Sequence, residues 1–311
     1  MISPATWIEC GRNSVQTWEC DQMGHMNVQF YVQRAEDAVA MFARHIGLGP
    51  AVAREANARL TPRQHHVRFH RELRPGAAYW LRAAPVHLPE NQIAIVVELV
   101  NTADGAVSCA ATGLYEWTDV SSRAVLDMPE TARAKAQRLI QPMPAAALER
   151  GIAVNTPPRA SATIADADSM GLIVALLGEV QSEHCDGAGF LRVRDHMGRV
   201  SDAIPNLLMR TTGRDRAAEG NRIGGAALEY RFVYRKPARA GDLISVRSGV
   251  KSIGAKTYNW VHWVLNEETG EAIATAEAVA VAMDLDARKA IAIPETLKAD
   301  LERLIIPGLS C

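Results

Sequence analysis

The chain carries the same short motif twice, at a constant spacing. Residues 15–27 read VQTWECDQMGHMN and residues 180–192 read VQSEHCDGAGFLR, so the pattern V-Q-[T/S]-x-x-C-D-x-x-G recurs 165 positions later. The same offset aligns further residues without a gap, namely Arg34 with Arg199, Arg74 and Gly76 with Arg239 and Gly241, and Pro129-Glu-Thr131 with Pro294-Glu-Thr296. A period of this length exceeds that of solenoid repeats. We therefore expect two tandem copies of a whole domain.

Both copies predict the same order of elements. Between Asn27 and Ile46 apolar side chains recur at helical spacing, with Asn27 as N-cap and Gly47 as the stop. Residues 7–20 alternate like a strand before this helix, and strand-like runs separated by turns follow it, at 66–73, 79–88, 92–100 and 107–120, and in the second copy at 230–235, 243–250, 257–265 and 272–285. Each copy is therefore predicted as a strand, one long helix and an antiparallel meander of four strands, which is an α+β class. Pro205 is expected to kink or restart the second helix.

The repeat predicts an N-terminal domain at 1–131 and a C-terminal domain at 169–311. The segment 132–168 joins them. Residues 129–150 are rich in Ala, Arg and Gln, and the first part of this stretch predicts a helix. Residues 151–168 contain Pro157 and Pro158 among Ser, Thr, Ala and Asp, which is typical of an exposed linker. A linker of this length allows the two copies to dock side by side.

Composition argues against several classes of function. The formal net charge of -1 offers no basic surface to a nucleic acid or an anionic membrane. No apolar run approaches the roughly 20 residues of a membrane helix, and the N-terminus lacks the pattern of a secretory signal. Five scattered cysteines without a C-x-x-C pair argue against a disulfide framework or a zinc site. We expect a cytosolic protein that uses no metal and no other cofactor.

The motif and its long helix resemble the hotdog-fold thioesterases of the 4-hydroxybenzoyl-CoA thioesterase type. The resemblance depends on Glu19-Cys-Asp-Gln-Met-Gly-His-Met-Asn27 and Tyr31, supported by Arg74-Pro-Gly76 and Pro237-Ala-Arg-Ala-Gly-Asp242, and it covers nearly the whole chain outside the linker. It implies a double hotdog, in which a sheet wraps a central helix in each repeat and the repeats form an intramolecular pseudo-dimer with active sites at the seam. It also implies an acyl-CoA thioesterase that releases a carboxylic acid and free CoA.

Asp21 is the candidate catalytic carboxylate. It lies just before the long helix, where it can act as nucleophile or as general base for a water. The start of the helix near Val28 has unpaired N–H groups and a partial positive charge, which suit a developing oxyanion. The resemblance carries the same roles onto Asp21 and Val28. A purely structural role for Asp21, in a turn or a cap, stays open.

The neighbouring residues have more than one interpretation. His25 either contacts the substrate carbonyl, orients Asp21 or lies at the surface, and Asn27 is an N-cap that is also a candidate for catalysis. Gly24 is expected to let the backbone approach the ligand. The candidates for substrate binding are Trp18, Tyr31, Arg74 and Arg239.

The second copy retains Asp186 and Gly189, but Phe190 replaces His25 and Arg192 replaces Asn27. We expect this copy to have lost its chemistry and to line a pocket or bind an anion. A solvated Arg192 without a ligand is the simpler interpretation of the same residue.

Other functions stay open. A hotdog-fold enoyl-CoA hydratase or dehydratase has a signature resembling D-x-N-P-x-H, whereas this chain has D-Q-M-G-H. The sequence is also compatible with a non-catalytic acyl-CoA-binding protein and with an acyl-carrier-protein thioesterase. It does not reveal the acyl group or whether the tandem unit forms a homo-oligomer.

Overall fold

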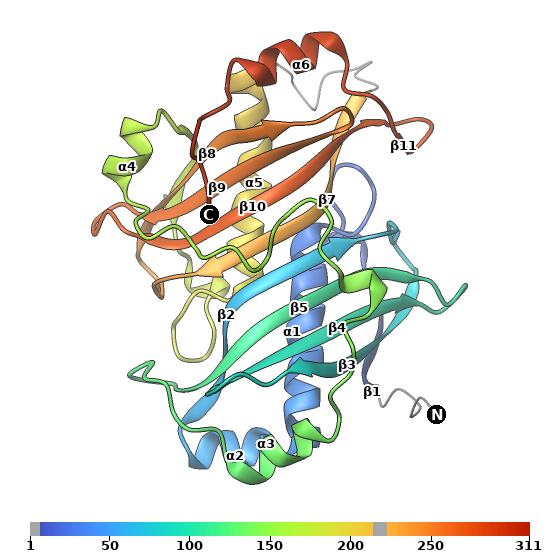
Figure 1. The fold of residues 1–311 in the computed structure, drawn as a ribbon, viewed down its shortest axis with the longest axis vertical. Coiled ribbons are helices and arrows are strands. Elements are labelled where there is room, and N and C mark those ends of the chain that lie inside the picture. The colour runs from blue at the N-terminus through green and yellow to red at the C-terminus, as the bar shows by residue number, and fades with distance from the viewer. Residues whose placement is uncertain (1–6, 214–222) are drawn as a thin grey trace. The chain divides into compact units, whose positions relative to one another are not determined.

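The computed structural model describes residues 7–213 and 223–311, which divide into two compact units, Met1–Leu148 and Glu149–Cys311 (Figure 1). Each unit contains one copy of the repeat, and the boundary falls inside the segment 132–168. The first six residues, which belong to the stretch inspected for a secretory signal, lie outside the described residues. None of the helices in the described part of the chain is both long and apolar enough to cross a membrane.

The first unit is a long helix packed against a five-stranded antiparallel sheet (Figure 1). The helix is α1 (Val28–Ile46). The strands, in sheet order, are β1 (Ile8–Ser14), β3 (Ala78–His87), β4 (Gln92–Asn101), β5 (Val107–Asp119) and β2 (Ala58–Phe69). Shorter elements are the 3₁₀ turns η1 (Thr17–Glu19) and η2 (Ala145–Ala147), and the helices α2 (Pro50–Glu55) and α3 (Glu130–Gln137).

α1 begins and ends where the sequence predicts. Asn27 is extended and its side chain accepts a hydrogen bond from the Gln29 N–H, while Gly47 ends the helix at a φ of 100°. The side chains of Phe42 and Ile46 are completely buried. Burial of each such side chain contributes roughly 1.5–3 kcal/mol, so this face holds the helix on the sheet.

The second unit repeats this arrangement. Its long helix is α5 (Val193–Thr212). Its strands, in sheet order, are β7 (Ile223–Tyr234), β10 (Ala272–Asp284), β9 (Thr257–Asn266), β8 (Leu243–Ile253) and β6 (Ile173–Glu179), and β11 (Lys289–Ala290) pairs with β10. Shorter elements are α4 (Ile164–Ser169), η3 (Ser182–His184) and α6 (Glu295–Glu302).

The sheet order corrects the predicted four-stranded meander. β3, β4 and β5 form a meander, as do β8, β9 and β10, but β2 pairs with β5, and β7 pairs with β10. The reason is that β1 and β4 already occupy the two edges of β3, just as β6 and β9 occupy those of β8. β2 and β7 also begin earlier than predicted, and β1 ends earlier, at Ser14.

The predicted restart at Pro205 is wrong. α5 runs without interruption through Pro205. A proline removes one backbone hydrogen bond, but Ala203 and Leu207 on either side of it are buried, and their packing keeps the helix in place.

The segment 151–168 is more firmly held than an exposed linker. Ile152, Ala162 and Ala167 are buried, and α4 lies at its end. Arg231 of β7 donates a hydrogen bond of 2.6 Å to the Thr156 carbonyl, and Asn259 of β9 donates one to the Gly151 carbonyl. Sheet side chains therefore hold the backbone of this segment against the second unit.

Candidate active site

The motif residues 20–27 form a loop whose two ends are joined in the first unit. The Asn27 N–H donates to the Glu19 carbonyl at 2.8 Å, and Cys20 and Met26 pair as an isolated bridge. The Met26 N–H donates to the Leu73 carbonyl, which ties the loop to the turn after β2. The loop is therefore fixed at the start of α1.

A tight turn inside the loop sets the position of Asp21. The Gly24 N–H donates to the Asp21 carbonyl at 2.9 Å, and Gly24 has a φ of 73°. A Cβ at this position would meet no other atom within 4 Å. The turn conformation, and not a lack of space, is therefore what requires glycine here.

The two carboxylate oxygens of Asp21 have different surroundings. Oδ1 accepts a hydrogen bond from the Met23 N–H at 2.9 Å and lies 3.8 Å from Nδ1 of His25. Oδ2 accepts no hydrogen bond from the residues that the structure describes. The Asp21 side chain is 19% exposed. One oxygen thus supports the turn, while the other is left for water or substrate.

His25 lies between two carboxylates. Its Nδ1 faces Asp21, and its Nε2 lies 3.6 Å from Oε1 of Glu72, in the turn after β2. Nδ1 also lies 3.4 Å from the Met26 carbonyl oxygen. Both carboxylate distances are longer than direct hydrogen bonds, and a bridging water spans such gaps.

The first N–H groups of α1 are only partly capped. The Gln29 N–H donates to Oδ1 of Asn27, and the Phe30 N–H donates to the Asn27 carbonyl. The Val28 N–H has no hydrogen-bond partner in the described part of the chain. It is therefore available to an oxygen of a ligand, with the positive end of the helix dipole behind it.

Tyr31 connects α1 to the turn after β2. Its hydroxyl accepts a hydrogen bond from the Leu73 N–H at 3.1 Å, and its ring packs edge-on against Phe69. Burial raises the pKa of the Tyr31 hydroxyl. This arrangement fits a structural wall better than a proton donor.

The other predicted substrate-binding residues lie in different environments. Trp18 is 74% exposed in η1, next to the motif loop. Arg74 is exposed at the turn after β2. Arg239, its counterpart in the second unit, lies with its guanidinium 4.0 Å from the centre of the Phe190 ring.

The corresponding loop of the second unit is built differently. Oδ1 of Asp186 accepts hydrogen bonds from the N–H groups of both Ala188 and Phe190, and Gly189 has a φ of 81°. Phe190 is buried where the first unit has His25. The turn is therefore retained, but without an imidazole.

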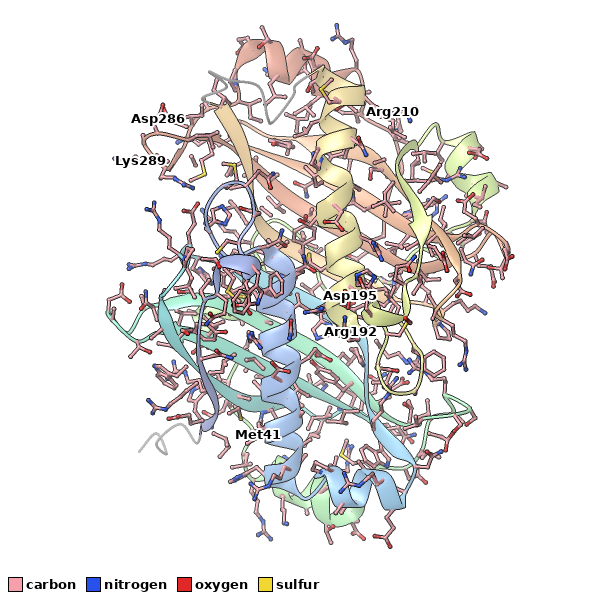
Figure 2. The ribbon with its side chains drawn as sticks, turned by 180° about the vertical axis from the view of Figure 1, so that it is seen from behind. Met41, Arg192, Asp195, Arg210, Asp286 and Lys289 are labelled. Atoms are coloured by element: carbon pink, nitrogen blue, oxygen red, sulfur yellow. The ribbon has the colours of Figure 1, made fainter. Side chains whose placement is uncertain are left out.

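Arg192 is engaged within its own unit. Its Nε donates to Oδ2 of the buried Asp195 at 2.9 Å, and the two residues lie together at the start of α5 (Figure 2). A second guanidinium nitrogen donates to the Glu183 carbonyl. An anion would have to compete with these contacts.

Comparison with known proteins identifies the family. The sequence model of the thioesterase-like superfamily matches residues 15–136 and, again, residues 180–301. These matches span most of the chain, and the second match begins 165 positions after the first, which is the offset of the repeat. The chain belongs to the thioesterase-like superfamily. The resemblance seen in the sequence is confirmed at this level, together with the two repeats and a thioester hydrolase as the class of enzyme.

Solved structures of other thioesterases share the fold of this superfamily member. A candidate oleoyl thioesterase from Lactobacillus plantarum has a TM-score of 0.67 at 11% identity, covering 90% of this chain and 97% of its own. A 12:0-ACP thioesterase from Umbellularia californica has a TM-score of 0.66 at 11% identity, covering 89% and 94%. An acyl-ACP thioesterase from Bacteroides thetaiotaomicron has a TM-score of 0.64 at 10% identity, covering 87% and 96%. The predicted double hotdog fold is confirmed. No curated protein sequence matches the chain.

The sequence assigned no role in the site to two residues near Asp21. Glu72 faces His25, and the buried Glu19 closes the motif loop. The internal repeat holds a signal for both residues. Where His25 becomes Phe190, Glu72 becomes Pro237 and Glu19 becomes His184. The described residues contain no group of three or more His, Cys, Asp or Glu side chains able to hold a metal ion.

Proposed function

We propose that the chain hydrolyses acyl-CoA thioesters at the first motif loop, in the manner of the 4-hydroxybenzoyl-CoA thioesterase type. One observation carries the proposal. The start of α1 combines a carboxylate oxygen without a hydrogen bond, on Asp21, with a backbone N–H without a partner, on Val28, among the residues that the structure describes. Thioester hydrolysis needs both a base or nucleophile and a donor for the oxyanion.

In this mechanism Asp21 acts as general base or as nucleophile. As a base it takes a proton from water, and the resulting hydroxide attacks the thioester carbonyl. The Val28 N–H and the helix dipole stabilise the oxyanion, whose collapse expels the CoA thiolate. As a nucleophile, Asp21 attacks the thioester carbonyl, the C–S bond breaks and CoA leaves as the thiolate, and water then hydrolyses the resulting anhydride to release the acid and restore Asp21. His25 donates a hydrogen bond to the substrate carbonyl or orients Asp21.

The other candidates have supporting roles in this proposal. Asn27 caps α1 and leaves the Val28 N–H unused, and Gly24 permits the turn that carries Asp21. Trp18, Tyr31 and Arg74 in the first unit contact the substrate, and Arg239 is the corresponding candidate for substrate binding in the second unit. The second loop, with Asp186, Gly189 and Arg192, serves as binding surface without chemistry. All five cysteines are free thiols, which fits a reducing compartment such as the cytosol.

An acyl-carrier-protein thioesterase is the second candidate, because two of the structural neighbours covered over nearly their whole length are named as ACP thioesterases. The test is to incubate the purified chain with matched acyl-CoA and acyl-ACP substrates and to measure free thiol. Faster release from acyl-CoA supports the proposal, and faster release from acyl-ACP favours the second candidate. Hydration of an enoyl-CoA without thiol release, or unchanged thioesters, would contradict both.

A further inference from the structure

The motif loop is fastened to α1 by one buried ion pair. Glu19, at the end of η1, is almost completely buried, and its Oε1 accepts a hydrogen bond from a guanidinium nitrogen of Arg34. Arg34 lies on α1, and its other terminal nitrogen donates to Oδ2 of Asp37 at 3.1 Å. The loop is thereby bound to a point within the helix as well as to its first residue.

Glu19 also makes hydrogen bonds to the residue before η1 and to the last residue of the loop. Its Oε2 accepts the Gln16 N–H at 2.9 Å on the entering side, and its carbonyl accepts the Asn27 N–H at 2.8 Å on the leaving side. Asp21 lies between these two contacts. A shift of Glu19 therefore moves Asp21 relative to the start of α1.

A buried ion pair adds little net stability compared with apolar side chains of similar size, because desolvation offsets the attraction. What it supplies here is a fixed geometry, since a carboxylate and a guanidinium bond in a defined orientation. We propose that Glu19 and Arg34 are positioning residues that fix the position of Asp21 relative to the Val28 N–H. The inference rests on the proposed function of Asp21.

The second unit provides a natural comparison for this ion pair. At the equivalent positions a nitrogen of Arg199 lies 2.7 Å from Nδ1 of His184, so an imidazole replaces the carboxylate of Glu19. Asp202 takes the place of Asp37. The unit whose loop lacks the His25 imidazole thus also lacks the carboxylate that Glu19 offers to Arg34, while Asp202 still interacts electrostatically with Arg199.

The first variant is Glu19→Gln, which keeps the shape and the acceptor oxygen but removes the charge. We expect kcat to fall about 10- to 100-fold with KM changed less than about threefold, because a displacement on the order of 1 Å at a catalytic group costs about that much. In an Asp21→Asn background the same change should cause no further loss, since both act through one group. His184→Gln is the matched control and should leave kcat within about twofold of wild type.

A second variant, Glu19→His, copies the partner found in the second unit. An imidazole accepts from Arg34 only when neutral, and burial beside the Arg34 guanidinium lowers its pKa below the ordinary value of about 6.5. We expect kcat to gain an acid limb below that pH while circular dichroism shows a folded protein. A profile identical to that of wild type would overturn the inference.

The outcomes separate this inference from the proposed function. If Asp21→Asn abolishes hydrolysis but Glu19→Gln leaves kcat unchanged, the positioning role is wrong and the proposed function stands. If Asp21→Asn retains activity, the proposed function fails, and the positioning role fails with it. Should Glu19→Gln not fold, Arg34→Lys is the alternative variant. It retains the positive charge but loses the guanidinium, whose two terminal nitrogens donate to Glu19 and Asp37. An unchanged kcat in that variant would likewise overturn the positioning role.

Discussion

Nε2 of His25 lies 3.6 Å from Oε1 of Glu72, which places a second carboxylate beside the imidazole that also faces Asp21. The two carboxylates approach different nitrogens of the ring. His25 is therefore oriented from both sides, one side belonging to its own loop and the other to the turn after β2.

Glu72→Gln should lower kcat about three- to tenfold. This is a small part of the roughly 10²–10⁴-fold rate enhancement that a positioned acid–base group supplies. The cause is a less well-oriented His25 beside Asp21. Steady-state kinetics of thiol release measure the effect. Glu183→Gln is the control, because Glu183 is an exposed carboxylate beside His184 in the second unit. Equal kcat values for wild type and Glu72→Gln would exclude a role for this contact.

Asn27→Ala should destabilise the protein by about 1 kcal/mol, since the Gln29 N–H loses its capping oxygen. Asn27→Ser retains a capping hydroxyl and should recover most of this loss. Thermal unfolding followed by circular dichroism compares the three proteins. If the alanine and serine variants unfold together, the cap contributes no stability.

Gly113→Ala should destabilise the protein by about 1–3 kcal/mol, because a Cβ on β5 would overlap the ring of Tyr115. The Tyr115 hydroxyl donates to Glu36 at 2.6 Å and lies 2.8 Å from Nε2 of His65, so the ring has little freedom to move. Gly178→Ala on β6 is the control, since its Cβ would meet nothing within 4 Å. Urea unfolding measures the free energy of unfolding of both variants. A larger decrease for Gly178→Ala than for Gly113→Ala would contradict the prediction.

His262 should make stability depend on pH. It is fully buried on β9, with Nδ1 2.8 Å from the Ser248 hydroxyl, and burial lowers the pKa of His262 to about 3. In the unfolded chain its pKa is about 6.5. Between these values the unfolded state binds the extra proton, so the contribution of His262 is complete above about pH 6.5 and is lost as the pH falls toward 3.

The measurement for His262 is the free energy of unfolding in urea over a series of pH values, for wild type and His262→Asn. The variant has lower stability at neutral pH but lacks this titration, so its stability should fall less between pH 6.5 and 4. Parallel curves for the two proteins over that interval would rule out a buried neutral histidine.

The sequence was sufficient to predict the elements that have strong local signals. The helical spacing, Asn27 and Gly47 defined α1 to the residue, and the constant offset identified two copies of one fold. The pairing of β2 with β5 was not predictable, because local patterns show that a strand exists but not which edge it meets. The contacts of Glu19 and Glu72 were missed for a related reason, since only the folded chain brings these residues next to Arg34 and His25.

The most direct test of the central claim compares Asp21→Asn with Asp186→Asn in hydrolysis of one acyl-CoA substrate. Asp21 has a carboxylate oxygen without a hydrogen bond in the described structure and lies beside the His25 imidazole, whereas the loop of Asp186 has the buried Phe190 in place of that imidazole. We predict that Asp21→Asn lowers kcat by at least about 10²-fold, while Asp186→Asn lowers it less than about fivefold. Equal losses in the two variants, or full activity of Asp21→Asn, would contradict a single active loop at the start of α1.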